Sequence, residues 1–200
     1  MGKFEIAAIL GGITILFFYS QLEVQTPAGQ SSGSGQAEYI RGTRPQIGDS
    51  LTPSSAGKIY GRQVTHIFDA VSLRAIDGDS LEAIVVDGTS REIRLASIDA
   101  PERNQKSGQA AQAHLAAIVK GQSARIYQTD TDRYSRAVSF VLTGDTGTDV
   151  NATMVSDGFA WHAIAYSDDP SLAELERQAK GARRGLWSQP SPVAPWVYRK

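Results

Sequence analysis

The chain has 200 residues, of which 41% are hydrophobic, so it can form one globular domain with a substantial core. Its 20 Lys and Arg residues against 21 Asp and Glu residues give a formal charge of −1, which excludes the strongly basic surface that drives tight non-specific binding to duplexes. The absence of cysteine excludes disulfides, thiolate zinc sites and cysteine nucleophiles, and leaves the cellular compartment open.

Residues 1–24 are typical of a membrane-targeting segment, because an uncharged, mostly apolar run from Ile6 to Tyr19 follows Lys3 and Glu5. A full span needs about 20 apolar residues, so the run suits the core of a signal peptide better. No small-x-small cleavage site follows it directly, which favours an uncleaved signal anchor. We expect membrane contact through this segment and an extracytoplasmic domain. The alternatives are secretion after cleavage and a buried helix of the main domain.

Residues 25–59 are dominated by Gly, Ser, Gln, Pro and Thr and predict a flexible linker. The pattern becomes ordered over residues 60–188, which we expect to form the main domain. Residues 189–200 contain several prolines and Trp196 and form a separate tail in this interpretation.

Five stretches of the main domain have strand-like composition and alternation: Phe68–Ile76, Asp79–Val86, Arg91–Ile98, Ala124–Thr129 and Ala137–Leu142. Asp87-Gly88 predicts a two-residue hairpin turn between the second and third. Such a turn would pair Asp79 with Ala96 and Leu81 with Arg94, so that Asp79 and Arg94 become diagonal neighbours on one face.

Three helices are predicted, each with recognisable ends: Ala110–Lys120 followed by Gly121, Val150–Asp157 followed by Gly158, and a last helix from Asp169-Pro170 to Gly185. The strands come in a run without crossover helices, which favours a five-stranded OB-type β-barrel in an α+β domain over a parallel sheet. We expect a monomer.

The side chains that could perform chemistry cluster at Asp77-Gly78-Asp79, Arg94 and Asp99-Ala100-Pro101-Glu102. Strict alternation sends Asp99 to the face opposite Arg94, so a bulge or bend at Gly78 or at the strand end is required to bring the acids together. Pro101 keeps Ala100 extended, so that its carbonyl could face an ion.

Two carboxylates and a backbone carbonyl make a hard-oxygen site that suits Ca²⁺ better than Mg²⁺. We assign Asp79, Asp99 and the Ala100 carbonyl to the metal, and Asp77 to orienting these ligands. In phosphodiester hydrolysis, Glu102 would act as general base or orient the water. Arg94 and Arg136 would make bidentate phosphate contacts.

Several segments resemble the staphylococcal nuclease family in their residues, order and spacing: Ile76-Asp77-Gly78-Asp79-Ser80, Arg94-Leu95, Ile98-Asp99-Ala100-Pro101-Glu102, Asp132-Arg133-Tyr134-Ser135-Arg136, Val150-Asn151 and Arg184-Gly185-Leu186-Trp187. The similarity runs from about Thr65 to Trp187, and the ending Pro192–Lys200 is similar to a tail in bacterial members. The resemblance implies an OB-like barrel, calcium dependence and cleavage of DNA and RNA.

Arg133, Tyr134 and Tyr166 are the candidate substrate-binding residues under this resemblance, although Tyr134 fits packing as well as base stacking. The sequence departs from the family at Arg103–Ser107, which is shorter than the flexible loop, and at Ile164, where a tyrosine is expected.

Two other functions compete with a nuclease. A catalytically silent barrel could bind single-stranded nucleic acid or a protein, but the near-neutral charge and the intact acids argue against it. An acidic cluster could also hold calcium only for stability, but Arg94 and Arg136 would then have no task. The sequence leaves open the choice between DNA and RNA, the mode of cleavage and the biological role.

Overall fold

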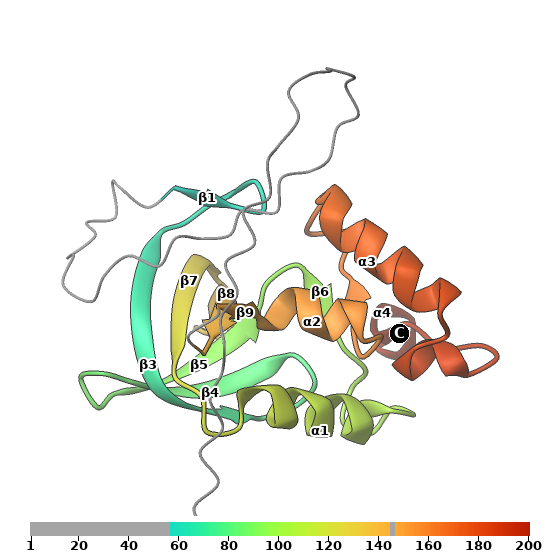
Figure 1. Cartoon of the computed structure of the whole chain (residues 1–200), viewed down its shortest axis with the longest axis horizontal. Helices are drawn as coiled ribbons and strands as arrows, with labels where there is room; N and C mark the ends of the chain where they lie inside the picture. Colours follow the sequence, from blue (N-terminus) through green and yellow to red (C-terminus); the bar gives the residue numbers. More distant parts are fainter. Residues whose placement is uncertain (1–56, 145–146) are drawn as a thin grey trace, which may run out of the picture. The chain divides into compact units, whose positions relative to one another are not determined.

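The computed structural model describes residues 57–144 and 147–200. A closed barrel of five long strands forms the centre of this domain, and Figure 1 shows the barrel on one side and helices α1, α2 and α3 on the other. The barrel strands are β3 (His66–Ala75), β4 (Ser80–Val85), β5 (Ser90–Leu95), β7 (Ala124–Thr131) and β8 (Ala137–Thr143). Short strands add to them: β1 (Lys58–Ile59), β2 (Arg62–Gln63), β6 (Ile98–Asp99), β9 (Thr148–Asp149) and β10 (Trp161–His162).

The barrel strands are antiparallel along the order β5-β4-β3-β7-β8, and a parallel pairing of β5 with β8 closes the barrel. The predicted five-stranded OB-type barrel in an α+β domain is therefore confirmed. The parallel closure pairs Arg94 of β5 with Val138 of β8. It therefore brings the residues just before β8 beside β5.

The register of the first hairpin differs by one residue from the predicted one. Ser80 lies opposite Arg94 and Leu81 opposite Ile93. The connection has three residues, Val86 to Gly88, because the Val85 N–H donates to the carbonyl of Thr89 and Gly88 takes a left-handed φ of 84°. A three-residue loop with glycine in this conformation is the common alternative to a two-residue turn.

Four α-helices and one 3₁₀ helix are described: α1 (Gly108–Val119), α2 (Val150–Ser156), α3 (Pro170–Gly181), η2 (Gly185–Ser188) and α4 (Pro195–Tyr198). The three predicted helices are present. The predicted end of the last one was wrong: α3 ends at Gly181, and Gly185 begins η2. Asp169 caps α3 as predicted, accepting hydrogen bonds from the N–H groups of Ser171 and Leu172.

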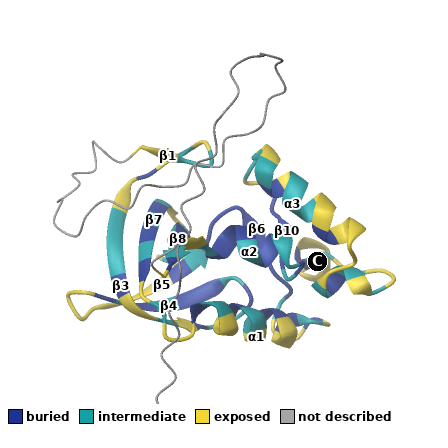
Figure 2. Cartoon of the chain, in the orientation of Figure 1, coloured by how far each residue is buried: buried dark blue, intermediate teal, exposed yellow. Residues whose placement is uncertain are grey.

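The core is built from buried residues of the barrel strands and of α1 and α2, which are dark blue in Figure 2. Along β4, Leu81, Ala83 and Val85 are buried while the residues between them are partly exposed, as expected for a strand with one face on a core. On α1, Ala111, Leu115 and Val119 are buried at a spacing of four residues. The spacing of these apolar residues thus determines which face of α1 packs on the core.

The membrane-targeting segment and most of the predicted linker lie outside the described residues. Within residues 57–144 and 147–200, no helix is long and apolar enough to cross a membrane.

Candidate active site

A sharp bend at residues 76–79 joins β3 to β4 and carries the first acidic residues. A Cβ atom added to Gly78 would lie 2.7 Å from the Cβ of Ala100 and 2.9 Å from that of Ala111, both too close for real atoms. Glycine therefore lets the bend pack directly against the segment after β6 and against α1. The Ala100 N–H donates a 2.7 Å hydrogen bond to Oδ2 of Asp79 across this contact.

Asp77 stabilises the bend through a hydrogen bond to the backbone of Asp79. Its Oδ1 accepts a 3.0 Å hydrogen bond from the N–H of Asp79, a local turn that aspartate makes readily. Asp77 thus fixes the backbone from which the Asp79 carboxylate projects.

A second irregularity lies between β5 and β6. Ala96 and Ser97 form a turn in which Ser97 has a left-handed φ of 63°. Two consecutive turn residues interrupt the strict alternation, so Asp99 is delivered to the side of Arg94 and Asp79. The prediction of a bend or bulge in this region is confirmed, both here and at Gly78.

Asn151, at the start of α2, holds this turn in place, and the sequence alone did not indicate this role. Its amide nitrogen donates to the carbonyls of Ala96 at 2.9 Å and Ser139 at 3.1 Å, and its carbonyl accepts from the N–H of Val141 at 3.1 Å. The side chain is fully buried. A buried amide with its hydrogen bonds satisfied fixes β8, α2 and the turn relative to one another.

The guanidinium of Arg94 lies between the two aspartates. Its Nη2 is 3.2 Å from Oδ2 of Asp79 and 3.3 Å from Oδ1 of Asp99. Its Nη1 donates to the carbonyls of Leu95 at 2.6 Å and Ile98 at 2.9 Å. These contacts use the N–H groups of both terminal nitrogens, so in this structure Arg94 organises the acids and the turn. Its predicted contact with phosphate stays a prediction.

Asp79 and Asp99 are largely buried, with side chains that are 13% and 8% exposed. Burial raises the pKa of Asp79 to about 6. Arg94 opposes this rise, whereas the nearby Asp77 and Asp99 add to it. The buried Asp79 carboxylate therefore holds a proton more tightly than an exposed aspartate, although Arg94 lies beside it.

Glu102 stands at the more open end of the group, with a side chain 42% exposed. Its N–H donates to Oε1 of Gln105 at 3.1 Å and its carbonyl accepts from the Gln105 N–H at 2.8 Å. Because these contacts close the loop before α1, the Glu102 carboxylate projects from a fixed backbone.

Arg199, near the C-terminus, also enters the site, and it was not among the residues predicted from the sequence. Its Nη2 lies 2.7 Å from Oδ2 of Asp99, and its Nη1 lies 2.7 Å from Oε1 of Glu102. No spacing signal could have found it, since 97 residues separate Arg199 from Glu102. Only the path of the tail brings the two together.

Arg136 reaches the group from the turn before β8. Its Nε donates to Oδ2 of Asp132 at 2.8 Å and its Nη1 to Oγ of Ser80 at 3.2 Å. Ser80 is the cross-strand partner of Arg94, so both predicted arginines lie over the same end of β4 and β5. Arg136 makes fewer side-chain hydrogen bonds than Arg94, and its Nη1 also lies 3.9 Å from Oε1 of Glu92.

Arg133 and Tyr134 form the tip of the same turn. The Tyr134 ring is 65% exposed, and the guanidinium of Arg133 lies 4.9 Å from its centre. The guanidinium of Arg136 lies 5.5 Å from the same centre. An exposed ring with two guanidiniums close to it offers aromatic and cationic groups that a nucleic acid could contact.

Tyr166 is 78% exposed and Ile164 74% exposed in the segment after β10. The carbonyl of Tyr166 accepts a 2.8 Å hydrogen bond from Nη1 of Arg62. In the described part of the chain, no hydrogen bond or ring contact joins Tyr166 to the acidic group. The structure therefore leaves its predicted substrate role without a supporting contact.

The donor set suits a hard divalent cation. Asp79 and Asp99 offer carboxylate oxygens and Ala100 offers a backbone carbonyl, which are the hard donors that Ca²⁺ prefers. Across residues 57–144 and 147–200, no three Asp, Glu, His or Cys side chains are gathered closely enough to hold a metal. The predicted site has only two carboxylates and a carbonyl as protein ligands, so calcium binding stays a prediction.

Comparison with known proteins agrees with the family that the motifs suggest. Residues 92–189 match the family described as staphylococcal nuclease homologue. An uncharacterized endonuclease of Escherichia coli O157:H7 is 36% identical over 148 residues, covering 74% of this chain and 89% of that protein. A micrococcal nuclease of Shigella flexneri is 36% identical over 137 residues, covering 64% of this chain and 78% of that protein.

The matched region contains Arg94, Asp99, Glu102 and Arg136, and the bend with Asp79 lies just before it. The fold, the grouped acids and arginines, and the extent of these similarities agree. The chain belongs to the staphylococcal nuclease family.

Proposed function

We propose that this protein is a nuclease that hydrolyses phosphodiester bonds in DNA, RNA or both, with calcium as its cofactor. The observation that carries the proposal is the convergence of Asp79, Asp99, Glu102, Arg94 and Arg136 at one end of β4 and β5. Relatives with nuclease names support the reaction class.

Asp79 and Asp99 would hold the calcium ion, with the carbonyl of Ala100 as a further ligand. A bound calcium ion would polarise the phosphodiester and favour ionisation of a water. Ala100 already contacts Asp79 through its N–H, so the two assigned residues are fixed relative to each other.

Glu102 is the group assigned to accept a proton from the attacking water. Its side chain is exposed enough to meet substrate, while its backbone is held by Gln105. As water attacks phosphorus, the bond from phosphorus to the leaving oxygen breaks and the proton passes to the Glu102 carboxylate. General-base catalysis of this kind contributes about 10²- to 10⁴-fold in rate.

Arg136 would neutralise charge on the phosphoryl oxygens, with Arg133 and Tyr134 beside it to contact the neighbouring nucleotide. Arg94 would add a second phosphate contact if the cation takes over its aspartate partners. This division of roles follows from how heavily each arginine is already engaged by the protein.

Incubation of the purified protein with single-stranded DNA, duplex DNA and RNA, in millimolar calcium or in chelator, tests the proposal. We expect shorter fragments in calcium and intact substrate in chelator. Intact substrate under every condition would refute hydrolysis, and bound but uncut nucleic acid would identify the silent binding barrel instead.

We also propose that residues 1–24 anchor the protein in the membrane with the nuclease domain outside the cytoplasm, or direct its secretion after cleavage. The support is the apolar run from Ile6 to Tyr19 in the sequence. Fractionation of cells and protease treatment of intact cells would test it, because a cytoplasmic domain would resist the protease.

A further inference from the structure

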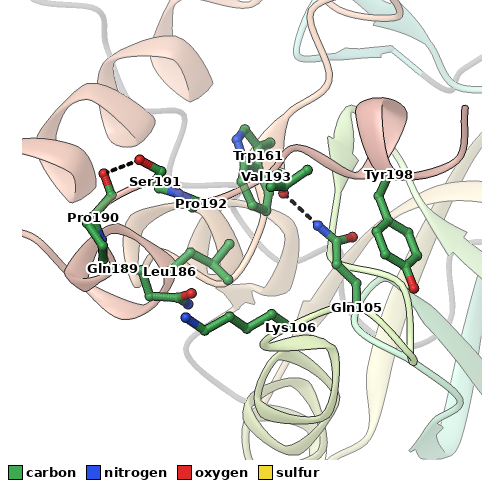
Figure 3. Close-up of a pocket in the computed structure, with 10 residues that line it drawn as sticks. All are labelled: Gln105, Lys106, Trp161, Leu186, Gln189, Pro190, Ser191, Pro192, Val193 and Tyr198. Carbon is green, nitrogen blue, oxygen red and sulfur yellow. Dashed lines mark hydrogen bonds between the residues drawn. The ribbon is translucent and has the colours of Figure 1, made fainter.

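The C-terminal segment, Gln189–Lys200, is anchored along the loop that carries Glu102. The side-chain amide of Gln105 donates a 2.6 Å hydrogen bond to the carbonyl of Val193, which Figure 3 shows beside the ring of Tyr198. The hydroxyl of Tyr198 donates to the carbonyl of Asn104 at 3.3 Å. These contacts do not involve Arg199, so they fix the segment independently of the acidic group.

Aromatic packing fixes the same segment to the strand that carries Asp99. Trp161 is the cross-strand partner of Asp99 in the pairing of β10 with β6. The ring of Trp196 meets the ring of Trp161 edge-on, with centres 6.4 Å apart, and Pro195 is buried. Aromatic packing therefore holds the C-terminal segment close to Asp99, independently of the ion pairs of Arg199.

The guanidinium of Arg199 bridges the two acids that this anchoring brings within reach. Its Nη1 and Nη2 lie 3.2 and 2.7 Å from Oδ1 and Oδ2 of Asp99, and Nη1 also lies 2.7 Å from Oε1 of Glu102. These hydrogen bonds, above all that to Asp99, raise the pKa of Arg199 above its ordinary value. The side chain is 46% exposed, so it has a route to solvent.

Arg199 and a divalent cation would meet the same carboxylate. Calcium binds carboxylate oxygens at about 2.3–2.6 Å, so a cation on Asp99 would lie within about 5 Å of a guanidinium that holds the same oxygens. At that distance two positive charges repel strongly in a partly buried site. Arg199 and the cation are therefore not expected to bind the Asp99 carboxylate fully at the same time.

We propose that Arg199 is a built-in competitor of the divalent cation: it neutralises Asp99 and Glu102 in the metal-free protein and is displaced from Asp99 when the cation binds. The inference rests on the proposed function, because it takes Asp99 as a cation ligand. The C-terminal segment stays anchored through Gln105 and Trp161 while the arginine side chain exchanges with the ion. Arg199 thereby sets the cation concentration at which the site fills and Glu102 becomes available.

Calcium titration by calorimetry, without nucleic acid, tests the competition directly. Arg199→Gln should bind calcium about tenfold more tightly than the wild-type protein or better, the scale of losing one competing charge-assisted hydrogen bond. Arg199→Lys, which keeps the charge but cannot bridge two carboxylates, should show a smaller gain. Lys200→Gln removes the same charge one residue further along and should leave the affinity within about twofold, because Arg199 is the one of these two residues that holds Asp99.

Thermal unfolding provides a second readout that does not depend on catalysis. In chelator, Arg199→Gln should unfold at a lower temperature than the wild-type protein, because Asp99 loses a partner. Saturating calcium should close this gap, since the ion replaces the arginine. A gap that is unchanged by calcium would mean that Arg199 is only a structural partner, and would overturn the proposal.

The outcomes separate this inference from the proposed function. Calcium-dependent cleavage by the wild-type protein, with equal or weaker calcium binding by Arg199→Gln, would overturn the competition and leave the nuclease intact. Calcium binding by none of the variants would overturn the competition and the calcium cofactor together. Tighter binding by Arg199→Gln without cleavage of any nucleic acid would support the competition and refute the nuclease.

Discussion

The carboxylate of Asp79 accepts a 2.7 Å hydrogen bond from the backbone N–H of Ala100, and this contact joins the two acidic segments of the site. It forms because the bend before β4 packs without a side chain at Gly78, whose added Cβ would lie 2.7 Å from the Cβ of Ala100. The geometry of the site thus depends on a position that carries no functional group.

Gly78→Ala should destabilise the protein by about 1–3 kcal/mol, the usual cost of adding a methyl group to a packed contact, and should weaken calcium binding. Denaturant unfolding and calcium titration measure the two effects. Gly181→Ala is the matched control, because nothing lies within 4 Å of the added Cβ and its stability should stay within about 0.5 kcal/mol of wild type. Equal effects of the two substitutions would show that the bend can accommodate a methyl group at Gly78, and would contradict the tight packing against Ala100.

Asn151→Ala should cost about 2 kcal/mol or more, because the carbonyl of Ala96 and the N–H of Val141 lose their hydrogen bonds to this side chain. The carbonyl of Ser139 loses one hydrogen bond and keeps that from the Ala96 N–H. The turn that delivers Asp99 should loosen, so cleavage should fall as well. Denaturant unfolding and cleavage assays check both. The Thr153→Ala variant of the same helix, which removes a hydrogen bond to the carbonyl of Asp149, should lose less stability and keep its activity.

Arg94→Lys should lower both activity and stability, because an ammonium cannot hold two aspartates and two carbonyls at once. We expect cleavage to fall by about 10²-fold or more and the protein to lose about 2–4 kcal/mol. Arg91→Lys changes an arginine of the same strand that lies over the ring of Phe68, and it should leave cleavage near the wild-type rate. Wild-type activity in Arg94→Lys would exclude the organising role.

The lowered pKa of the buried His162 should make the folded protein less stable in mild acid. Burial lowers its pKa below the ordinary 6.5, so below that pH the unfolded chain binds a proton that the folded protein does not. Stability due to this group is therefore present above pH 6.5 and is lost as the pH falls through that value, by at most about 1.4 kcal/mol per pH unit. Unfolding of His162→Gln between pH 5 and 7.5 should show a shallower pH slope, whereas the exposed His66→Gln should match the wild type. Identical slopes in all three proteins would contradict the assignment.

The barrel could be predicted because its causes are local. Leu81, Ala83 and Val85 are apolar at every second position of β4, and glycines follow the predicted helices at Gly121 and Gly158, where φ is indeed left-handed. The hairpin register failed because a dipeptide such as Asp87-Gly88 is compatible with both two- and three-residue loops. One residue of difference changed the partner of Arg94 from Leu81 to Ser80.

The composition of the acidic group could also be predicted, since its segments are short and their order is distinctive. Its internal contacts could not. The role of Asn151 follows from the position of α2 against β8, which the sequence does not give. The role of Arg199 follows from the packing of Trp196 against Trp161, which holds the tail near Asp99. Both depend on packing between segments far apart in the chain, for which a single sequence carries no local signal.

Single-turnover cleavage of DNA and RNA by Glu102→Gln in saturating calcium tests whether this site hydrolyses phosphodiesters with Glu102 as the proton acceptor. Glu174→Gln is the control, because Glu174 is an acid of α3 that pairs with Arg177 and Gln178 of the same helix. Glu102→Gln should fold and bind calcium but cleave at least about 10²-fold more slowly, while Glu174→Gln should stay near wild type. Cleavage by Glu102→Gln within a few-fold of the wild-type rate would contradict this role of Glu102.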